Sequence, residues 1–124
     1  MSAQSWPTEL RLGKDRRTLV VAFDDGAQFE LTAEMLRVMS PSADVQGHSE
    51  SERKTVGGKR NVSIIKVDTV GNYAVRIGFD DMHDSGIYSW AFLREMGENA
   101  EEKFASYLTD LSAKGLDRDK LGVR

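Results

Sequence analysis

The apolar residues in the first quarter of the chain alternate with polar ones, as they do in short half-buried strands. Residues 9–12 alternate, and residues 18–23 form a β-branched and apolar run. Residues 24–26 read Asp-Asp-Gly, which is typical of a turn, and residues 28–31 alternate again. The pattern predicts a hairpin over residues 18–31 with one short strand before it.

A helical spacing replaces this alternation immediately after the hairpin. The apolar residues on one helical stripe are Leu31, Met35, Val38 and Met39. Thr32 is suited to cap the first turn, and Pro41 excludes a helix that continues much beyond Met39. We therefore expect a short helix between Thr32 and Met39.

A second hairpin is predicted around Gly71-Asn72, a two-residue sequence that favours tight turns between antiparallel strands. Its strands occupy residues 62–70 and 73–79. The side chains expected on the core face of the second strand are Tyr73, Val75, Ile77 and Phe79.

Two helices are expected in the last third of the chain. Ser85 is a candidate cap for a helix over about 87–96 that ends at Gly97, with Trp90 and Phe92 in the core. Asn99 and Glu102 have the spacing of a capping box for the second helix, which Gly115 ends. Its apolar stripe is Phe104, Tyr107, Leu108 and Leu111.

These elements predict an α+β fold, an antiparallel β-sheet of hairpins with two to three helices packed on one face. A length of 124 residues favours one domain. We place that domain at residues 7–97, a C-terminal helix packing on it at 98–115, and a flexible charged tail at 116–124.

Composition narrows the classes of function. The chain contains no cysteine, which excludes disulfides, thiolate nucleophiles and metal sites built on sulfur. A net charge of −3 does not favour nucleic acid as a partner. No signal peptide or membrane-spanning apolar run is apparent, so we expect a cytoplasmic protein.

A run of acids surrounds one histidine between the second hairpin and the following helix. Asp80, Asp81, His83 and Asp84 are residue types that bind divalent metals, and His48 could join them only if its loop folds back. Neighbouring residues of one loop rarely converge on a point. We therefore expect Asp84 and Ser85 to cap the helix, and keep a small metal-binding protein as the alternative.

Residues 40–61 form a long loop rich in serine, glycine and charge, and it holds the chain's basic cluster. The cluster comprises Arg53, Lys54, Lys59 and Arg60. The sequence Gly57-Gly58-Lys59-Arg60 lacks the first glycine and the Ser or Thr of a phosphate-binding loop. A solvated turn is the better interpretation, with contact to an acidic partner or RNA as the alternative.

Several blocks, spread in order over roughly residues 7–97, resemble the gamma-butyrobetaine hydroxylase-like N-terminal domain family. They include Phe23-Asp24-Asp25-Gly26, Ser40-Pro41-Ser42-Ala43, Val45-Gln46-Gly47-His48, Val70-Gly71-Asn72-Tyr73 and His83-Asp84-Ser85-Gly86-Ile87-Tyr88-Ser89-Trp90. The resemblance is to small standalone bacterial proteins, and to domains attached to oxygenases of carnitine synthesis and to ATPases of iron–sulfur assembly.

In the oxygenases the resemblance implies a zinc ion held by three cysteines and one histidine, with catalysis in another domain. The corresponding positions here are Ser40, Ser42, Val45 and His83. A serine hydroxyl does not replace a thiolate, and valine has no donor atom. We therefore expect no zinc and no cofactor, with hydrogen bonds from Ser40, Ser42 and His83 holding the loop instead.

The sequence thus predicts a non-enzymatic protein-binding or scaffold module, linked to iron–sulfur assembly by family analogy alone. The predicted partner surface joins the 40–61 loop to the turn at residues 81–85, because loops carry most recognition. Its residues are His48, Arg53, Lys54, Lys59, Arg60, Asp81 and Asp84. A metal-binding protein that uses His83, His48 and nearby aspartates remains the alternative.

Overall fold

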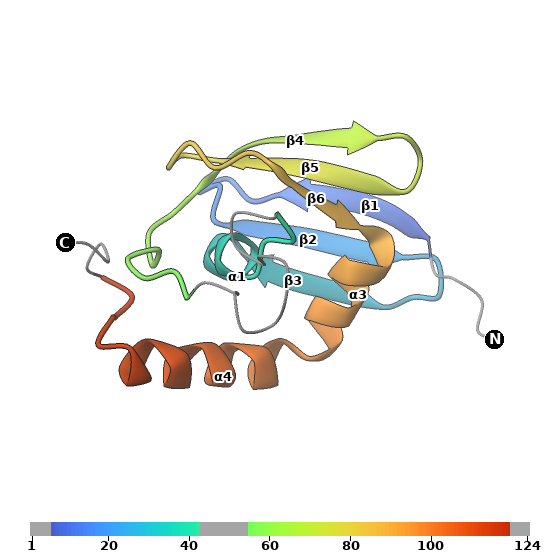
Figure 1. The fold of residues 1–124 in the computed structure, drawn as a ribbon. Helices are drawn as coiled ribbons and strands as arrows, with labels where there is room; N and C mark the ends of the chain where they lie inside the picture. The colour runs from blue at the N-terminus through green and yellow to red at the C-terminus, as the bar shows by residue number, and fades with distance from the viewer. Residues whose placement is uncertain (1–5, 43–54, 120–124) are drawn as a thin grey trace.

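A computed structural model describes residues 6–42 and 55–119 of the chain (Figure 1). Six strands and three helices follow one another in these segments. The strands are β1 (Pro7–Leu12), β2 (Thr18–Phe23), β3 (Gln28–Thr32), β4 (Ile64–Val70), β5 (Ala74–Phe79) and β6 (Gly86–Ser89). The helices are α1 (Ala33–Val38), α3 (Trp90–Glu98) and α4 (Ala100–Ala113).

The strands form two three-stranded antiparallel sheets, ordered β1-β2-β3 and β4-β5-β6. Both predicted hairpins are present, and the α+β class is confirmed. The turn between β1 and β2 connects the sheets, because Arg16 O accepts a hydrogen bond from Ile64 N at 2.7 Å. The Arg16 side chain donates back to Ile64 O at 2.9 Å.

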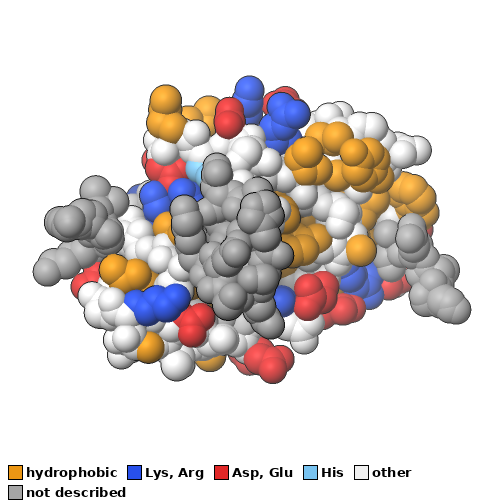
Figure 2. Space-filling view, viewed as in Figure 1, with side chains coloured by type: hydrophobic (Ala, Val, Ile, Leu, Met, Phe, Trp, Pro, Cys, Tyr) orange, Lys and Arg blue, Asp and Glu red, His pale blue; other side chains and the backbone are white. Residues whose placement is uncertain are grey.

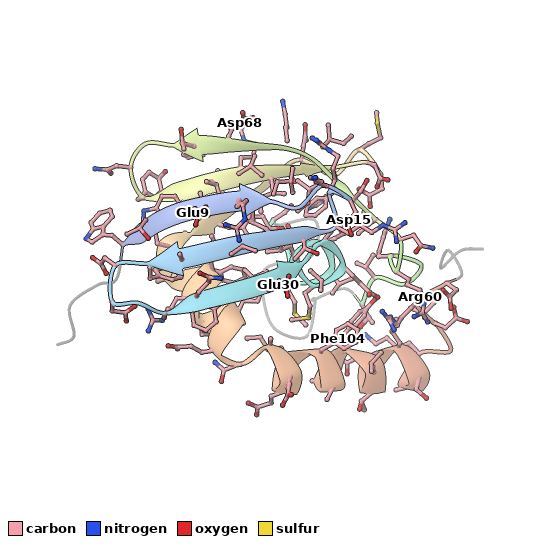
Figure 3. The ribbon with its side chains drawn as sticks, turned by 180° about the vertical axis from the view of Figure 1, so that it is seen from behind. Glu9, Asp15, Glu30, Arg60, Asp68 and Phe104 are labelled. Atoms are coloured by element: carbon pink, nitrogen blue, oxygen red, sulfur yellow. The ribbon has the colours of Figure 1, made fainter. Side chains whose placement is uncertain are left out.

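Helices α1 and α3 lie on one side of these strands, and α4 runs beyond the edge of β3 (Figure 1), while the side away from α1 and α3 carries exposed charged side chains such as Glu9, Glu30 and Asp68 (Figure 3). The core is packed between strands and helices. Its fully buried side chains include Leu19, Val21, Leu36, Ile77, Tyr88 and Leu93. Thr32 caps α1 as predicted, because its Oγ1 accepts from Met35 N at 3.1 Å.

Helix α3 begins later than the sequence pattern indicated. Residues 86–89 are strand β6, which pairs with β5 and buries Tyr88 completely. Ser89 caps α3 by accepting from Phe92 N at 3.1 Å, so the predictions that Asp84 and Ser85 cap this helix are wrong. Helix α3 also continues through Gly97 to Glu98, so the prediction that Gly97 ends it is wrong. A glycine is needed there for packing, because a Cβ at Gly97 would come within 2.5 Å of the Phe29 ring.

Helix α4 ends before Gly115, which has a φ of +71°, as predicted. The capping box is not formed, because Asn99 makes no side-chain cap and its Nδ2 donates to Glu95 O at 3.1 Å. Residues 116–119, expected in a flexible tail, lie against the domain. Leu116 packs on the core, and Arg118 forms a bidentate ion pair with buried Glu34 at 2.8 and 2.6 Å.

Several predicted site residues lie outside the described part of the chain. They are Val45, His48, Arg53 and Lys54. Among the described residues, no helix has the length and apolar character needed to cross a membrane.

Candidate functional site

A cluster of polar side chains joins the end of α1 to the turn between β5 and β6. We call it the polar junction, and its members are Arg37, Ser40, Ser42, Lys59, Asp81, His83 and Ser85. Met82 lies at the tip of this turn with a positive φ of +77°, and it is 88% exposed. The flanking residues Asp81 and His83 turn inward towards α1.

Asp81 is the charged centre of the polar junction. Its Oδ2 accepts from Arg37 Nε at 2.7 Å and from Lys59 Nζ at 2.5 Å, and its Oδ1 accepts from His83 N at 3.1 Å. The three charged side chains are only 12–18% exposed. Burial raises the pKa of Asp81, but the hydrogen bonds from Lys59 and Arg37 outweigh it and hold that pKa below its usual value.

The other half of the polar junction consists of three serines and the histidine. Ser40 Oγ lies 3.0 Å from His83 Nε2 and accepts from Ser42 N at 3.2 Å, while Ser42 Oγ lies 2.8 Å from Ser85 Oγ. Ser40 is completely buried. Gly86 packs so closely that a Cβ there would lie 2.5 Å from Ser40 Oγ, so the junction has no spare space.

The acidic residues of this turn face different partners. Asp80 accepts from the backbone and hydroxyl of Ser63 at 3.2 and 3.0 Å, and Asp84 is exposed. Two cations surround the one carboxylate of Asp81, which disfavours a divalent metal there. Across the described residues, no three His, Cys, Asp or Glu side chains are grouped to hold a metal ion.

Lys59 and Arg60, the described half of the basic cluster, both form ion pairs within the domain. Lys59 contacts Asp81, and Arg60 Nε donates to Asp119 Oδ1 at 2.5 Å. Backbone bonds from Gly58 N to Asp117 O and from Arg60 N to Arg118 O, at 2.9 and 3.0 Å, align this segment with the chain's end. The segment Gly58–Arg60 therefore supports the C-terminal residues, and the predicted solvated turn is only partly correct.

A groove of about 440 Å³ lies between β3 and α4. We call it the β3–α4 groove. One wall is Glu30, Leu31 and Thr32 from β3, and the other is Phe104, Ala105 and Leu108 from α4. Met35 also lines it, and its lining is mainly apolar. Figure 3 shows Glu30 and Phe104 on its two sides. Leu108, expected in the core, is 40% exposed here.

A shallower apolar surface lies elsewhere on the molecule. Figure 2 shows hydrophobic side chains gathered over β6 and the start of α3. Tyr73 and Ile87 are among the exposed residues of this region, at 56% and 42%. Trp90 is half-buried there, and its Nε1 donates to Asn72 O at 2.9 Å. The aromatic pair Trp90 and Phe92 is therefore packed against the core without being enclosed by it.

A family model described as gamma-butyrobetaine hydroxylase-like, N-terminal, matches residues 10–94. The chain belongs to this family. No curated protein matches it. Two NMR solution structures are similar to it, each with a TM-score of 0.82. The first is 36% identical in sequence, and the match covers 98% of both chains. The second is 41% identical, and the match covers 100% of this chain and 95% of the other.

A crystal structure from Acidithiobacillus ferrooxidans is also similar. It is described as a protein of unknown function from the family named domain of unknown function 971. The identity is 37% and the TM-score 0.62, over 73% of this chain and 91% of that chain.

Within this family, the polar junction contains three of the four positions to which the resemblance assigned zinc ligands, namely Ser40, Ser42 and His83, and the fourth, Val45, lies outside the described residues. The residues present do not fit a zinc ion. Ser40 and Ser42 supply neutral hydroxyls, and Ser40 Oγ is directly hydrogen-bonded to His83 Nε2, the one nitrogen ligand expected. The sequence predicted hydrogen bonds from Ser40, Ser42 and His83 without naming their partners, and the structure pairs Ser40 directly with His83.

Two features of these sites were not predicted from the sequence. Arg37 was not singled out, although it sits one helical turn before Pro41 and holds Asp81. The β3–α4 groove was missed because Leu108 shares a helical stripe with buried Tyr107 and Leu111. The apolar stripe of this helix is too wide to be buried entirely against one core, so part of it stays exposed. The width of the stripe was the sequence signal for the groove.

Proposed function

We propose that this chain is a protein-binding module without catalytic chemistry of its own. The observation that carries the proposal is the β3–α4 groove, an open and mainly apolar hollow with the exposed side chain of Leu108 on its wall. Apolar surface of this kind, rimmed by polar residues, is characteristic of contact sites for other molecules.

The polar junction supports the non-catalytic part of the proposal. A general acid or base needs a proton that it can exchange with a substrate. Asp81 is held by two cations and a backbone N–H, and His83 Nε2 is bonded to buried Ser40. Asp81 is therefore held as a stabilising anion, and the Ser40 hydroxyl bonded to His83 is completely buried, away from any substrate.

The partner surface predicted from sequence, which joins the 40–61 loop to the turn at 81–85, is kept as the second location within this proposal. Met82 and Asp84 are the exposed side chains of that turn. We place the protein in the cytoplasm, and by family analogy alone we connect its partner with iron–sulfur assembly.

Photocrosslinking in living cells tests the proposal. A benzoylphenylalanine placed at Leu108 reports on the groove, at Asp84 on the turn, and at Ile87 on the apolar surface of β6. All three side chains are exposed, so the replacements do not disturb the core. We expect a discrete protein adduct from position 108, identified by mass spectrometry, and none from position 87.

An adduct from position 84 alone would support the binding function and show that the partner binds at the turn instead of the groove. The absence of a discrete protein adduct at all three positions would contradict the proposal. Because the probe is introduced into the cell, this result does not depend on guessing the partner's sequence.

A further inference from the structure

Backbone groups along the outer edge of strand β3 have no hydrogen-bond partner among residues 6–42 and 55–119. In the β2–β3 pair, Phe23 N donates to Ala27 O, and Ala33 N donates to Arg17 O, both at 2.8 Å. Bonding towards a neighbour strand alternates along a strand, so Leu31 and Phe29 also bond towards β2. The N–H and C=O groups of Gln28 and Glu30 therefore point away from β2, and within the described residues they have no hydrogen-bond partner.

The groove runs along this edge. Glu30, Leu31 and Thr32 are consecutive and all line it. Successive side chains of a strand point to opposite faces of the sheet, so three consecutive residues can line one hollow only along the strand's edge. Of the strands that the structure describes, β3 is the terminal one of its sheet, and none of them pairs with it on this side.

Helix α4 supplies the opposite wall, and it is apolar where it faces the edge. Phe104 and Leu108 are four residues apart and so lie on one helical face, with Leu31 and Met35 completing an apolar lining. Arg118 holds this wall in place, because it pairs with Glu34 and lies 5.1 Å from the centre of the Phe104 ring.

The rim of the groove is negative. Glu30 on β3 and Glu101 on α4 both line it and are exposed, and among the described residues neither forms an ion pair. Arg118, the one Lys or Arg among the described residues that line the groove, is already bound by Glu34. A bound segment that carries lysine or arginine would neutralise these two carboxylates.

We infer that the β3–α4 groove binds an extended segment of another protein, which adds as a fourth strand to the edge of β3. Alternate apolar side chains of that segment contact Phe104 and Leu108, and the basic side chains between them face Glu30. Strand addition of this kind combines backbone hydrogen bonds with pockets for alternate side chains. The inference rests on the proposed function and specifies the partner's conformation and charge.

Peptide selection tests the inference. A phage-displayed library of random peptides, each about ten residues long and thus sufficient for one strand, is selected on the immobilised full chain. We expect selected peptides to alternate apolar residues with lysine or arginine. Leu108→Glu should weaken their binding at least about tenfold, while the matched change Ile65→Glu, at an exposed apolar site on β4 outside both candidate binding surfaces, should leave it unchanged.

The backbone bond is tested by two variants at one residue. Glu30→Ala removes the charge and should weaken binding about threefold, an effect that disappears at high salt. Glu30→Pro also removes the outward N–H, and should weaken binding at least about tenfold. Proline is tolerated where the N–H of an edge strand faces solvent, and thermal unfolding checks the fold.

Peptides methylated at successive backbone nitrogens give the same information on the unmodified protein, whether or not Glu30→Pro folds. Binding should fail at alternate positions. Helical selected peptides, uniform tolerance of N-methylation, or binding unaffected by Leu108→Glu would overturn the inference. So would a library that yields no binder specific for the groove. A crosslink from position 108 would still support the proposed function in these cases, so the two failures are distinguishable.

Discussion

The polar junction and the β3–α4 groove use the same kinds of residue in opposite ways. In the junction the Asp81 carboxylate meets two cations and a backbone N–H, and those side chains are mostly enclosed. In the groove the carboxylates of Glu30 and Glu101 are exposed, and no described residue forms an ion pair with either. The comparison shows that charges already satisfied within a fold stabilise it, whereas unsatisfied ones remain available to a partner.

Removal of Asp81 should have the largest effect on stability. Asp81→Ala leaves Arg37 and Lys59 close together without their anion, and loss of one partner of such a buried cluster costs about 4 kcal/mol. Urea unfolding measures the change. Glu9→Ala, which removes an exposed partner of Arg11, is the control and should cost less than about 1 kcal/mol. Similar costs for the two variants would show that the junction is not specially stabilising.

The stabilisation by Asp81 should depend on pH. The pKa of Asp81 is lower in the folded chain than the unfolded value of about 3.9. Its contribution is therefore complete above that value and is lost as the pH falls through the folded pKa. The difference in unfolding free energy between the wild type and Asp81→Asn should be constant near neutrality and shrink below about pH 4. A difference that grows in acid would contradict this assignment.

Arg118→Ala should have the next largest effect, because it leaves the buried carboxylate of Glu34 without its bidentate partner. We expect a loss of about 3 kcal/mol in unfolding free energy. Arg60→Ala serves as the control, since its partner Asp119 is exposed. If Arg118→Ala were neutral, the C-terminal residues could not be said to hold the groove's wall.

Gly86→Ala tests how tightly the polar junction is packed. The new Cβ would lie 2.5 Å from Ser40 Oγ, so Ser40 must move, at a cost of about 2 kcal/mol. Gly78→Ala in the neighbouring strand is the matched control, because its nearest neighbour would be 3.4 Å away. Equal unfolding free energies for the two variants would indicate a looser junction than the structure describes.

Leu108→Glu should have the smallest effect on stability. Its side chain lines an open groove, so the unfolding free energy should change by less than about 0.5 kcal/mol. Leu111→Ala on the same helix removes a buried side chain and should cost about 3 kcal/mol. A large loss at Leu108 would make the groove part of the core and weaken its role in binding.

Local sequence patterns predicted the elements whose determinants lie close together in the chain. Both hairpins and the Thr32 cap follow from turn residues and spacing within a few residues. Strand β6 was mistaken for the first turn of a helix, because its four residues are too few to separate the two periods. Residues 86–89 form a strand because they pair with the edge of β5, whose backbone groups need hydrogen-bond partners.

The sequence by itself determined the family, the α+β class and the loss of the thiol ligands, because these depend on residue identity and order. Only the tertiary structure decided that Ser40 meets His83, that Arg37 holds Asp81, and that the edge of β3 faces α4. These contacts join residues more than 40 positions apart. They depend on which strand ends each sheet and where each helix packs, which no local pattern specifies.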